Sequence, residues 1–213
     1  MKRVLLICLS LVLALVGGSA VCAEEGFYVI GVGGKSAPVP KTGQTTSYGP
    51  GDDGAVKKGV AWPAPRFTDN GDNTVTDSLT KLVWTKNANY WGTKTWMEAL
   101  ELAGRLHDEY PVMIKTGVHD GSKVGDWRLP NHKELESLVD CGFYNPALPN
   151  TLGTGKWTGG DPFQGVSSSS YWSSTIYAGR TAGAWLMNIY DGYVYNEDKS
   201  GVYLHVWCVR GGP

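Results

Sequence analysis

Apolar residues with the two-residue spacing of β-strands fall into four segments of the chain. Around an Asn-Gly-Asp-Asn turn in "RFTDNGDNTVTDSLTKLVW", residues 66–84, apolar positions alternate with polar ones and predict a β-hairpin. "YWSSTIYA" predicts a strand, and "AWLMNIYDGYVYNED" predicts a hairpin whose Asp191-Gly192 pair is typical of a type I′ turn. "GVYLHVWCVRG" predicts one last strand.

Helical spacing appears twice. Thr95 and Glu98 have the spacing of a capping box, and the apolar residues after them recur every three or four positions, which predicts a helix from about Trp96 to His107. In "GDWRLPNHKELESLVDCG", Asn131 is a predicted N-cap with Glu134 as its partner at the third helical position. Hairpin, two helices, a Gly/Pro/Ser-rich loop and a final antiparallel meander together predict an α+β domain.

The same stretch is interpreted as a structural corner. We expect Trp127 and Leu129 to anchor the turn and Pro130, Asn131 and Glu134 to start the helix. For Arg128 we expect a buried ion pair with a carboxylate.

The N-terminus has the composition of an export signal. Residues 1–23 have a basic start, an apolar run and a small residue before the predicted cleavage point, which is typical of a signal peptide. Cleavage after Ala23 is favoured over lipidation of Cys22, because the residues before Cys22 make a poor lipobox. Residues 24–60 are interpreted as a leader and loop, and 61–213 as the globular domain. We therefore expect a periplasmic, secreted or cell-surface protein.

Charge and hydropathy narrow the classes of partner. Without Lys2 and Arg3, the 19 basic residues become 17 against 20 acidic ones. A nucleic-acid partner is not expected, since phosphate contacts need a basic face. No apolar stretch after residue 23 is long enough to span a bilayer.

Candidate chemistry is sparse. The four histidines lack metal-ligand spacing and "GVSSSSYWSS" is not a nucleophile elbow, so no catalytic residue is predicted. Asp69, Asp72 and Asp77 surround one turn and could hold calcium, or could instead bond the turn's own backbone. No other cofactor is expected. Cys141 and Cys208 are an even pair in an exported chain and predict a disulfide, with two buried thiols as the alternative.

Aromatic residues offer the best candidates for binding. The 9 Trp and 11 Tyr far outnumber the 4 Phe, and indole and phenol rings suit stacking on sugars or protein surfaces. Core packing is the competing interpretation for any one ring. The predicted binding residues lie in the region 172–196 and are Trp172, Tyr177, Arg180, Tyr190, Asp191, Tyr193 and Tyr195.

The segments quoted above, ending in "VWCVRGG", occur in an order that resembles the Lcl_C family, the C-terminal domain of collagen-like bacterial adhesins, over about residues 40–213. "WRLPN" followed by Glu is also similar to formylglycine-generating enzymes. These resemblances imply a C-type-lectin-like fold, with two helices packed on small twisted antiparallel sheets, and a role in adhesion or carbohydrate binding. The chain has no collagen-like repeat and no basic surplus for sulfated glycans.

We therefore expect an exported binding protein for a cell-surface glycan or protein, with oligomerisation left open. A structural role in the cell envelope is the first alternative. A degenerate relative of the formylglycine-generating enzymes is the second.

Overall fold

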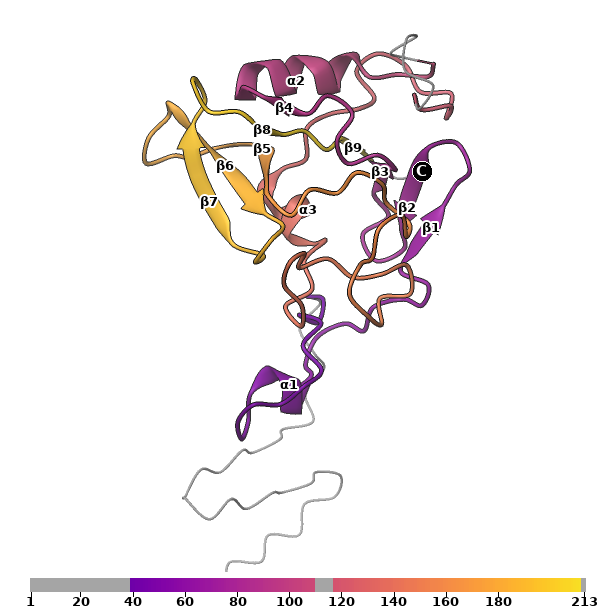
Figure 1. Cartoon of the computed structure of the whole chain (residues 1–213), viewed down its shortest axis with the longest axis vertical. Coiled ribbons are helices and arrows are strands. Elements are labelled where there is room, and N and C mark those ends of the chain that lie inside the picture. The colour runs from indigo at the N-terminus through magenta and orange to yellow at the C-terminus, as the bar shows by residue number, and fades with distance from the viewer. Residues whose placement is uncertain (1–38, 110–116, 212–213) are drawn as a thin grey trace, which may run out of the picture.

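The computed structural model describes residues 39–109 and 117–211. The predicted signal peptide and Cys22 lie outside these residues. Two sheets and three helices make up the described fold (Figure 1), which is of the α+β class. In chain order the helices are α1 (Asp53–Val56), α2 (Trp96–Arg105) and α3 (His132–Glu136).

The smaller sheet has the strand order β1-β2-β3-β9 and is antiparallel throughout. The predicted first hairpin is confirmed, because β1 and β2 flank the turn at residues 70–73. The strands of this sheet are β1 (Phe67–Asp69), β2 (Thr74–Asp77), β3 (Val83–Thr85) and β9 (Val209–Arg210).

The larger sheet has the order β4-β8-β5-β6-β7 and is mixed, because β5 and β8 run parallel. The predicted hairpin at Asp191-Gly192 joins β6 to β7, but it is not a type I′ turn. Only Gly192 of that pair has positive φ, at 79°, and its N–H donates to the carbonyl of Asn188 at 2.8 Å in a wider turn. The strands are β4 (Thr93–Lys94), β5 (Ser170–Ile176), β6 (Gly183–Asn188), β7 (Val194–Asp198) and β8 (Leu204–His205).

Both predicted helices form with their capping boxes. The Thr95 side chain accepts from the Glu98 N–H while Glu98 bonds back to the Thr95 N–H, and Asn131 and Glu134 do the same for α3. Helix α2 ends at Arg105, two residues before the predicted end, because Leu106 adopts an extended backbone.

The two helices serve opposite faces of the larger sheet. Tyr171 and Met187 pack with Leu135 and Leu138, in and just after α3, in one hydrophobic cluster. Their strand neighbours Trp172 and Leu186 point the other way, into a second cluster with α2. In Figure 1, α2 lies along the top of the molecule and α3 near its centre.

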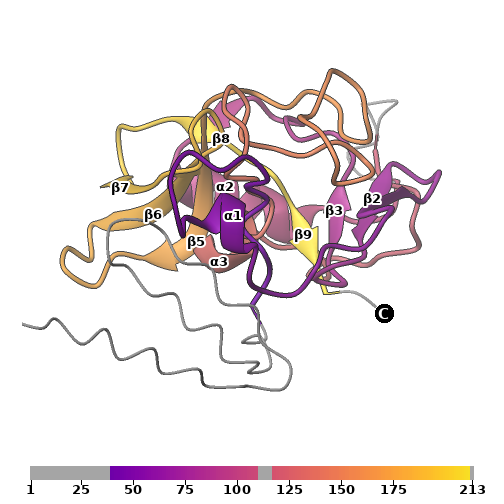
Figure 2. The same ribbon diagram turned by 90° about the horizontal axis from the view of Figure 1, so that it is seen from below.

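The predicted last strand is interrupted. Residues 204–205 form β8 in the larger sheet, and residues 209–210 form β9 in the smaller one. Between them side chains alternate, with Trp207 and Val209 in the first cluster and Val206 and Cys208 in the second. This segment therefore belongs to both sheets and both clusters (Figure 2).

The segment of residues 39–60 projects from the body and carries α1, as Figure 1 shows. Its base bonds to the body, because the Cys141 N–H donates to the Thr42 carbonyl at 2.8 Å. Buried Arg66 lies nearby, with its guanidinium carbon 4.2 Å from the Trp62 ring centre. Asp77 and the Ser137 carbonyl accept hydrogen bonds from this guanidinium.

Candidate functional site

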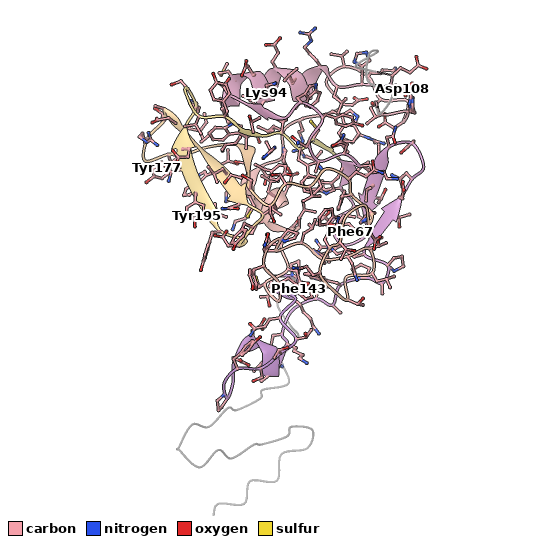
Figure 3. The ribbon with its side chains drawn as sticks, viewed as in Figure 1. Phe67, Lys94, Asp108, Phe143, Tyr177 and Tyr195 are labelled. Carbon is pink, nitrogen blue, oxygen red and sulfur yellow. The ribbon has the colours of Figure 1, made fainter. Side chains whose placement is uncertain are left out.

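Tyr195 lies on β7 and Tyr193 directly precedes this strand, two residues away, so that the two rings share one face, as the sequence predicted. Their side chains are 63% and 46% exposed, and their rings meet edge to face with centres 6.1 Å apart. Edge-to-face contact favours a fixed arrangement of the two rings. Figure 3 shows Tyr195 on the outer side of the hairpin.

A second pair of tyrosines joins them at the turn. Tyr190 is 43% exposed, and its ring meets that of Tyr144 with centres 6.4 Å apart. Asp191 bonds the Tyr193 N–H at 3.0 Å and so orders the turn between the pairs. We call Tyr144, Tyr190, Tyr193 and Tyr195 the tyrosine surface. The sequence did not single out Tyr144, which reaches the hairpin only through the fold.

The prediction of Trp172 as a binding residue is wrong. Its side chain is fully buried in the cluster beneath α2, and its indole N–H donates to the Lys94 carbonyl at 2.9 Å. Trp172 is a core residue with a satisfied polar atom.

Tyr177 and Arg180 lie toward the other end of the hairpin. The Tyr177 ring meets that of Trp185 with centres 5.0 Å apart. Arg180 forms an ion pair with Asp198 and contacts the Asn196 side chain. The two residues are near β7, but their contacts brace the loop between β5 and β6 and do not extend the tyrosine surface.

A groove of about 400 Å³ adjoins the turn of the hairpin. Gly192 is in its wall, and a β-carbon added there would come within 2.8 Å of Val139, so the turn needs glycine for close approach as well as for its positive φ. The groove separates the projecting N-terminal segment from α3, and its lining is mostly apolar, with Pro40, Trp62, Val139 and Cys141 among its residues.

The corner at residues 127–134 is structural. Trp127 and Leu129 are buried, and the Trp127 indole N–H donates to the Ser122 hydroxyl at 2.9 Å. Arg128 does pair with a carboxylate, Glu134, but its side chain is 46% exposed, so the expectation of burial is corrected. Arg128 follows the turn onto the surface because its neighbours on both sides point inward.

The three carboxylates considered for calcium each bond other groups of the protein. Asp69 pairs with Lys86, Asp72 bonds the backbone and hydroxyl of Thr74, and Asp77 bonds Arg66. Within the described residues, no cluster of three acidic, His or Cys side chains could hold a metal ion. Each aspartate serves its own turn or ion pair.

The predicted Cys141–Cys208 disulfide is absent, and both cysteines are free. Cys208 faces the cluster beneath α2, whereas Cys141 is exposed at the base of the N-terminal segment. Burial, together with the carboxylates of Asp140, Asp53 and Glu136, raises the pKa of the Cys141 thiol. Neither cysteine is an activated nucleophile, since burial also raises the pKa of Cys208.

None of the helices in residues 39–109 and 117–211 is long and apolar enough to cross a membrane. A comparison with curated proteins found no match. Comparison with family models matched residues 73–210 to the Lcl C-terminal domain. The match covers every strand from β2 onward, both α2 and α3, and the tyrosine surface. With more than half of its length in that match, the chain belongs to the Lcl_C family.

Proposed function

We propose that the protein is an exported binding protein that recognises an uncharged glycan through its tyrosine surface. Lcl_C is a domain of extracellular adhesins and is not a known enzyme family, which supports binding over catalysis. The observation that carries the proposal is the exposure of two pairs of contacting tyrosines, Tyr144 with Tyr190 and Tyr193 with Tyr195. By contrast, the side chains of Trp84, Trp127, Trp172 and Trp207 are buried.

Tyrosine rings on a regular hairpin suit sugars. Each ring offers a flat apolar face for the C–H side of a pyranose and a hydroxyl for hydrogen bonding. Tyr195 lies on β7, and the carbonyl of Tyr193 accepts a hydrogen bond from the Asn188 N–H just before this strand. Because the two rings also contact each other, little side-chain freedom is lost on binding.

The charges around these rings favour a ligand without anionic groups. Asp191 lies in the turn between the tyrosine pairs, and Glu197 is exposed two residues after Tyr195. Carboxylates accept hydrogen bonds from sugar hydroxyls and repel sulfate or carboxylate substituents. Two cations near the hairpin are engaged: Arg180, in the loop before β6, pairs with Asp198, and the Lys156 ammonium donates to the carbonyls of Tyr144 and Asn145.

A glycan array tests the proposal. Wild-type protein is expected to bind a set of neutral glycans, and Tyr193→Ala and Tyr195→Ala are each expected to lower the affinity about tenfold or more, as loss of one stacking contact would do. Tyr203→Ala is the matched control, because Tyr203 is 59% exposed but precedes β8, away from the hairpin. Wild-type protein that binds no glycan, or three variants with equal effects, would contradict the proposal.

The alternatives have less support. A structural role in the envelope predicts co-purification with envelope components that the Tyr193→Ala and Tyr195→Ala changes leave unaffected. A degenerate formylglycine-generating enzyme would need a pair of reactive thiols. Among the described residues, Cys208 is buried in the core and Cys141 is exposed at the surface, so these two thiols do not form such a pair.

A further inference from the structure

Strand β7 is an open edge of the larger sheet, whose order ends at β6-β7. Figures 1 and 2 both place β7 at the margin of the molecule. Its register with β6 runs from Val194 to Asp198 without a shift. A regular edge strand presents unpaired backbone groups at every second residue, and these can pair with another strand.

The hydrogen bonds between β6 and β7 show which residues of β7 direct their backbone N–H and C=O groups away from the sheet. At the two ends, the Asn188 N–H donates to the Tyr193 carbonyl at 2.8 Å, and the Lys199 N–H donates to the Ala182 carbonyl at 3.0 Å. Hydrogen-bonded pairs alternate along an antiparallel ladder, so Tyr195 and Glu197 also direct their backbone groups toward β6. The N–H and C=O groups of Val194, Asn196 and Asp198 therefore point away from the sheet. Within the described chain no backbone hydrogen bond satisfies them.

This edge carries few of the features that prevent pairing. Its sequence, VYNED, contains no proline or lysine, and its pairing with β6 contains no bulge. Such features commonly protect exposed edges. Of the features that prevent edge pairing, this strand has only charge, on Glu197 and Asp198. The Asp198 carboxylate is already paired with Arg180.

We propose that two copies of the protein associate through antiparallel pairing of their β7 strands, with the two-fold axis at Asn196. In this register Asn196 faces Asn196 of the second copy, Val194 faces Asp198, and Tyr195 faces Glu197. The three outward residues of each strand then form about six backbone hydrogen bonds, and the two sheets become one.

Charge selects this register and makes the edge self-complementary. Each carboxylate faces an uncharged side chain. A shift of two residues toward the C-terminus would place Glu197 opposite Glu197, which is repulsive. The same shift in the other direction would place Asp198 opposite Gly192 in the turn, outside the strand. Only the register centred on Asn196 pairs the full strand.

The association leaves the tyrosine rings available. Side chains stand above and below a sheet, whereas strand pairing uses its edge. Tyr195 of one copy comes to lie diagonally across from Tyr195 of the other, on the same face, so the two tyrosine surfaces join. The pairing itself does not depend on what these surfaces bind.

Light scattering after size-exclusion chromatography, over a range of concentrations, tests the association. Wild-type protein is expected at twice the mass of one chain. Asn196→Pro removes the central outward N–H without touching the bonds to β6, and it is expected to yield the mass of one chain. Asn196→Ala keeps the N–H and removes the same side chain, so it is the matched control and is expected to remain dimeric. A wild-type monomer at every concentration, or a dimer that survives Asn196→Pro, would overturn the proposal.

Cysteine cross-linking tests the register in protein carrying Cys141→Ser, so that the exposed native thiol does not react. With Asn196→Cys, the two cysteines face each other as a hydrogen-bonded pair, about 5.5 Å apart at Cα, which suits a disulfide. Oxidation is expected to link most of the Asn196→Cys chains and few of the Glu197→Cys chains. Equal linking of the two variants would refute the register.

Discussion

Arg128 and Glu134 form a bidentate ion pair, in which Nη1 donates to Oε2 at 2.7 Å and Nη2 donates to Oε1 at 2.6 Å. The same carboxylate accepts the Asn131 N–H at 2.8 Å and so completes the capping box of α3. One side chain thus joins the turn before the helix to its first residues. We expect Glu134→Ala to lower the free energy of unfolding by about 1–2 kcal/mol, through loss of the cap and a partly exposed ion pair.

Urea unfolding measures this loss. Glu136→Ala is the control, since Glu136 pairs with Lys133 in the exposed part of the same helix and is expected to matter by less than about 0.5 kcal/mol. Equal effects of the two substitutions would show that the cap contributes nothing.

Acid is expected to remove the Glu134 contribution. Burial raises the pKa of Glu134, but the hydrogen bonds from Arg128 and Asn131 outweigh it, and the net pKa is lowered. The stability is therefore present above the pKa of an unfolded glutamate, about 4.3, and is lost as pH falls through the lower folded value. Unfolding curves of wild type and Glu134→Gln should converge as the pH approaches and passes below that range; a constant gap would contradict this linkage.

Substitution in the buried ion pair of Arg66 and Asp77 should lower the free energy of unfolding far more than substitution of Glu134. Both side chains are fully buried, and Arg66 Nη1 has no hydrogen-bond partner, so loss of Asp77 leaves a poorly satisfied cation in the core. We expect Asp77→Ala to cost about 3–5 kcal/mol, measured by thermal or urea unfolding. Asp69→Ala, which breaks the exposed pair with Lys86, should cost under about 1 kcal/mol. If the two substitutions cost the same, burial is not the cause.

The two thiols should react at very different rates. After the proposed cleavage that follows Ala23, only Cys141 and Cys208 remain. We expect a thiol reagent to modify Cys141 in the folded protein, slowly at neutral pH and faster in alkali because its pKa is raised, and to reach Cys208 only after unfolding. Mass spectrometry of the labelled protein checks the order. No free thiol after denaturation without reductant would instead establish the disulfide.

Trp172→Ala should act on stability and not on recognition. Removal of this buried ring is expected to cost about 3–5 kcal/mol by cavity formation, as urea unfolding would measure. Trp172→Phe should cost less because it refills part of the space. Tyr193→Ala, at an exposed position, should leave stability nearly unchanged. A stable Trp172→Ala variant would contradict its assignment to the core.

Local signals in the sequence predicted the local structure well. The capping residues Thr95 with Glu98, and Asn131 with Glu134, mark the starts of both larger helices because capping depends on residues three positions apart. The hairpin turns were located for the same reason. The type of the second turn was not, because the Asp-Gly pair is compatible with a wider turn in which the Gly192 N–H bonds the Asn188 carbonyl.

Long-range placement was harder to foresee. The register puts Trp172, Leu186 and Tyr195 on one face of the larger sheet. The alternation of apolar and polar residues along the strands therefore cannot distinguish the buried Trp172 from the exposed Tyr195. Trp172 is buried because α2 covers the central strands, and Tyr195 is exposed because it lies on the edge. Strand order is set by the whole fold and cannot be deduced from local periodicity. The disulfide prediction was wrong for the same reason, because counting cysteines does not say which way each one points.

The division of the last strand between β8 and β9 has a consequence for the timing of folding. Residues 204–210 supply strands to both sheets and side chains to both hydrophobic clusters. They lie at the end of the described residues, which stop at 211. A chain still being synthesised therefore lacks the strand that pairs with β4 in the described sheet, and also the outer neighbour of β3, until residues 204–210 have been made. Folding waits for contacts between distant parts of the chain, which is slow, and a truncation of about ten residues should prevent it altogether.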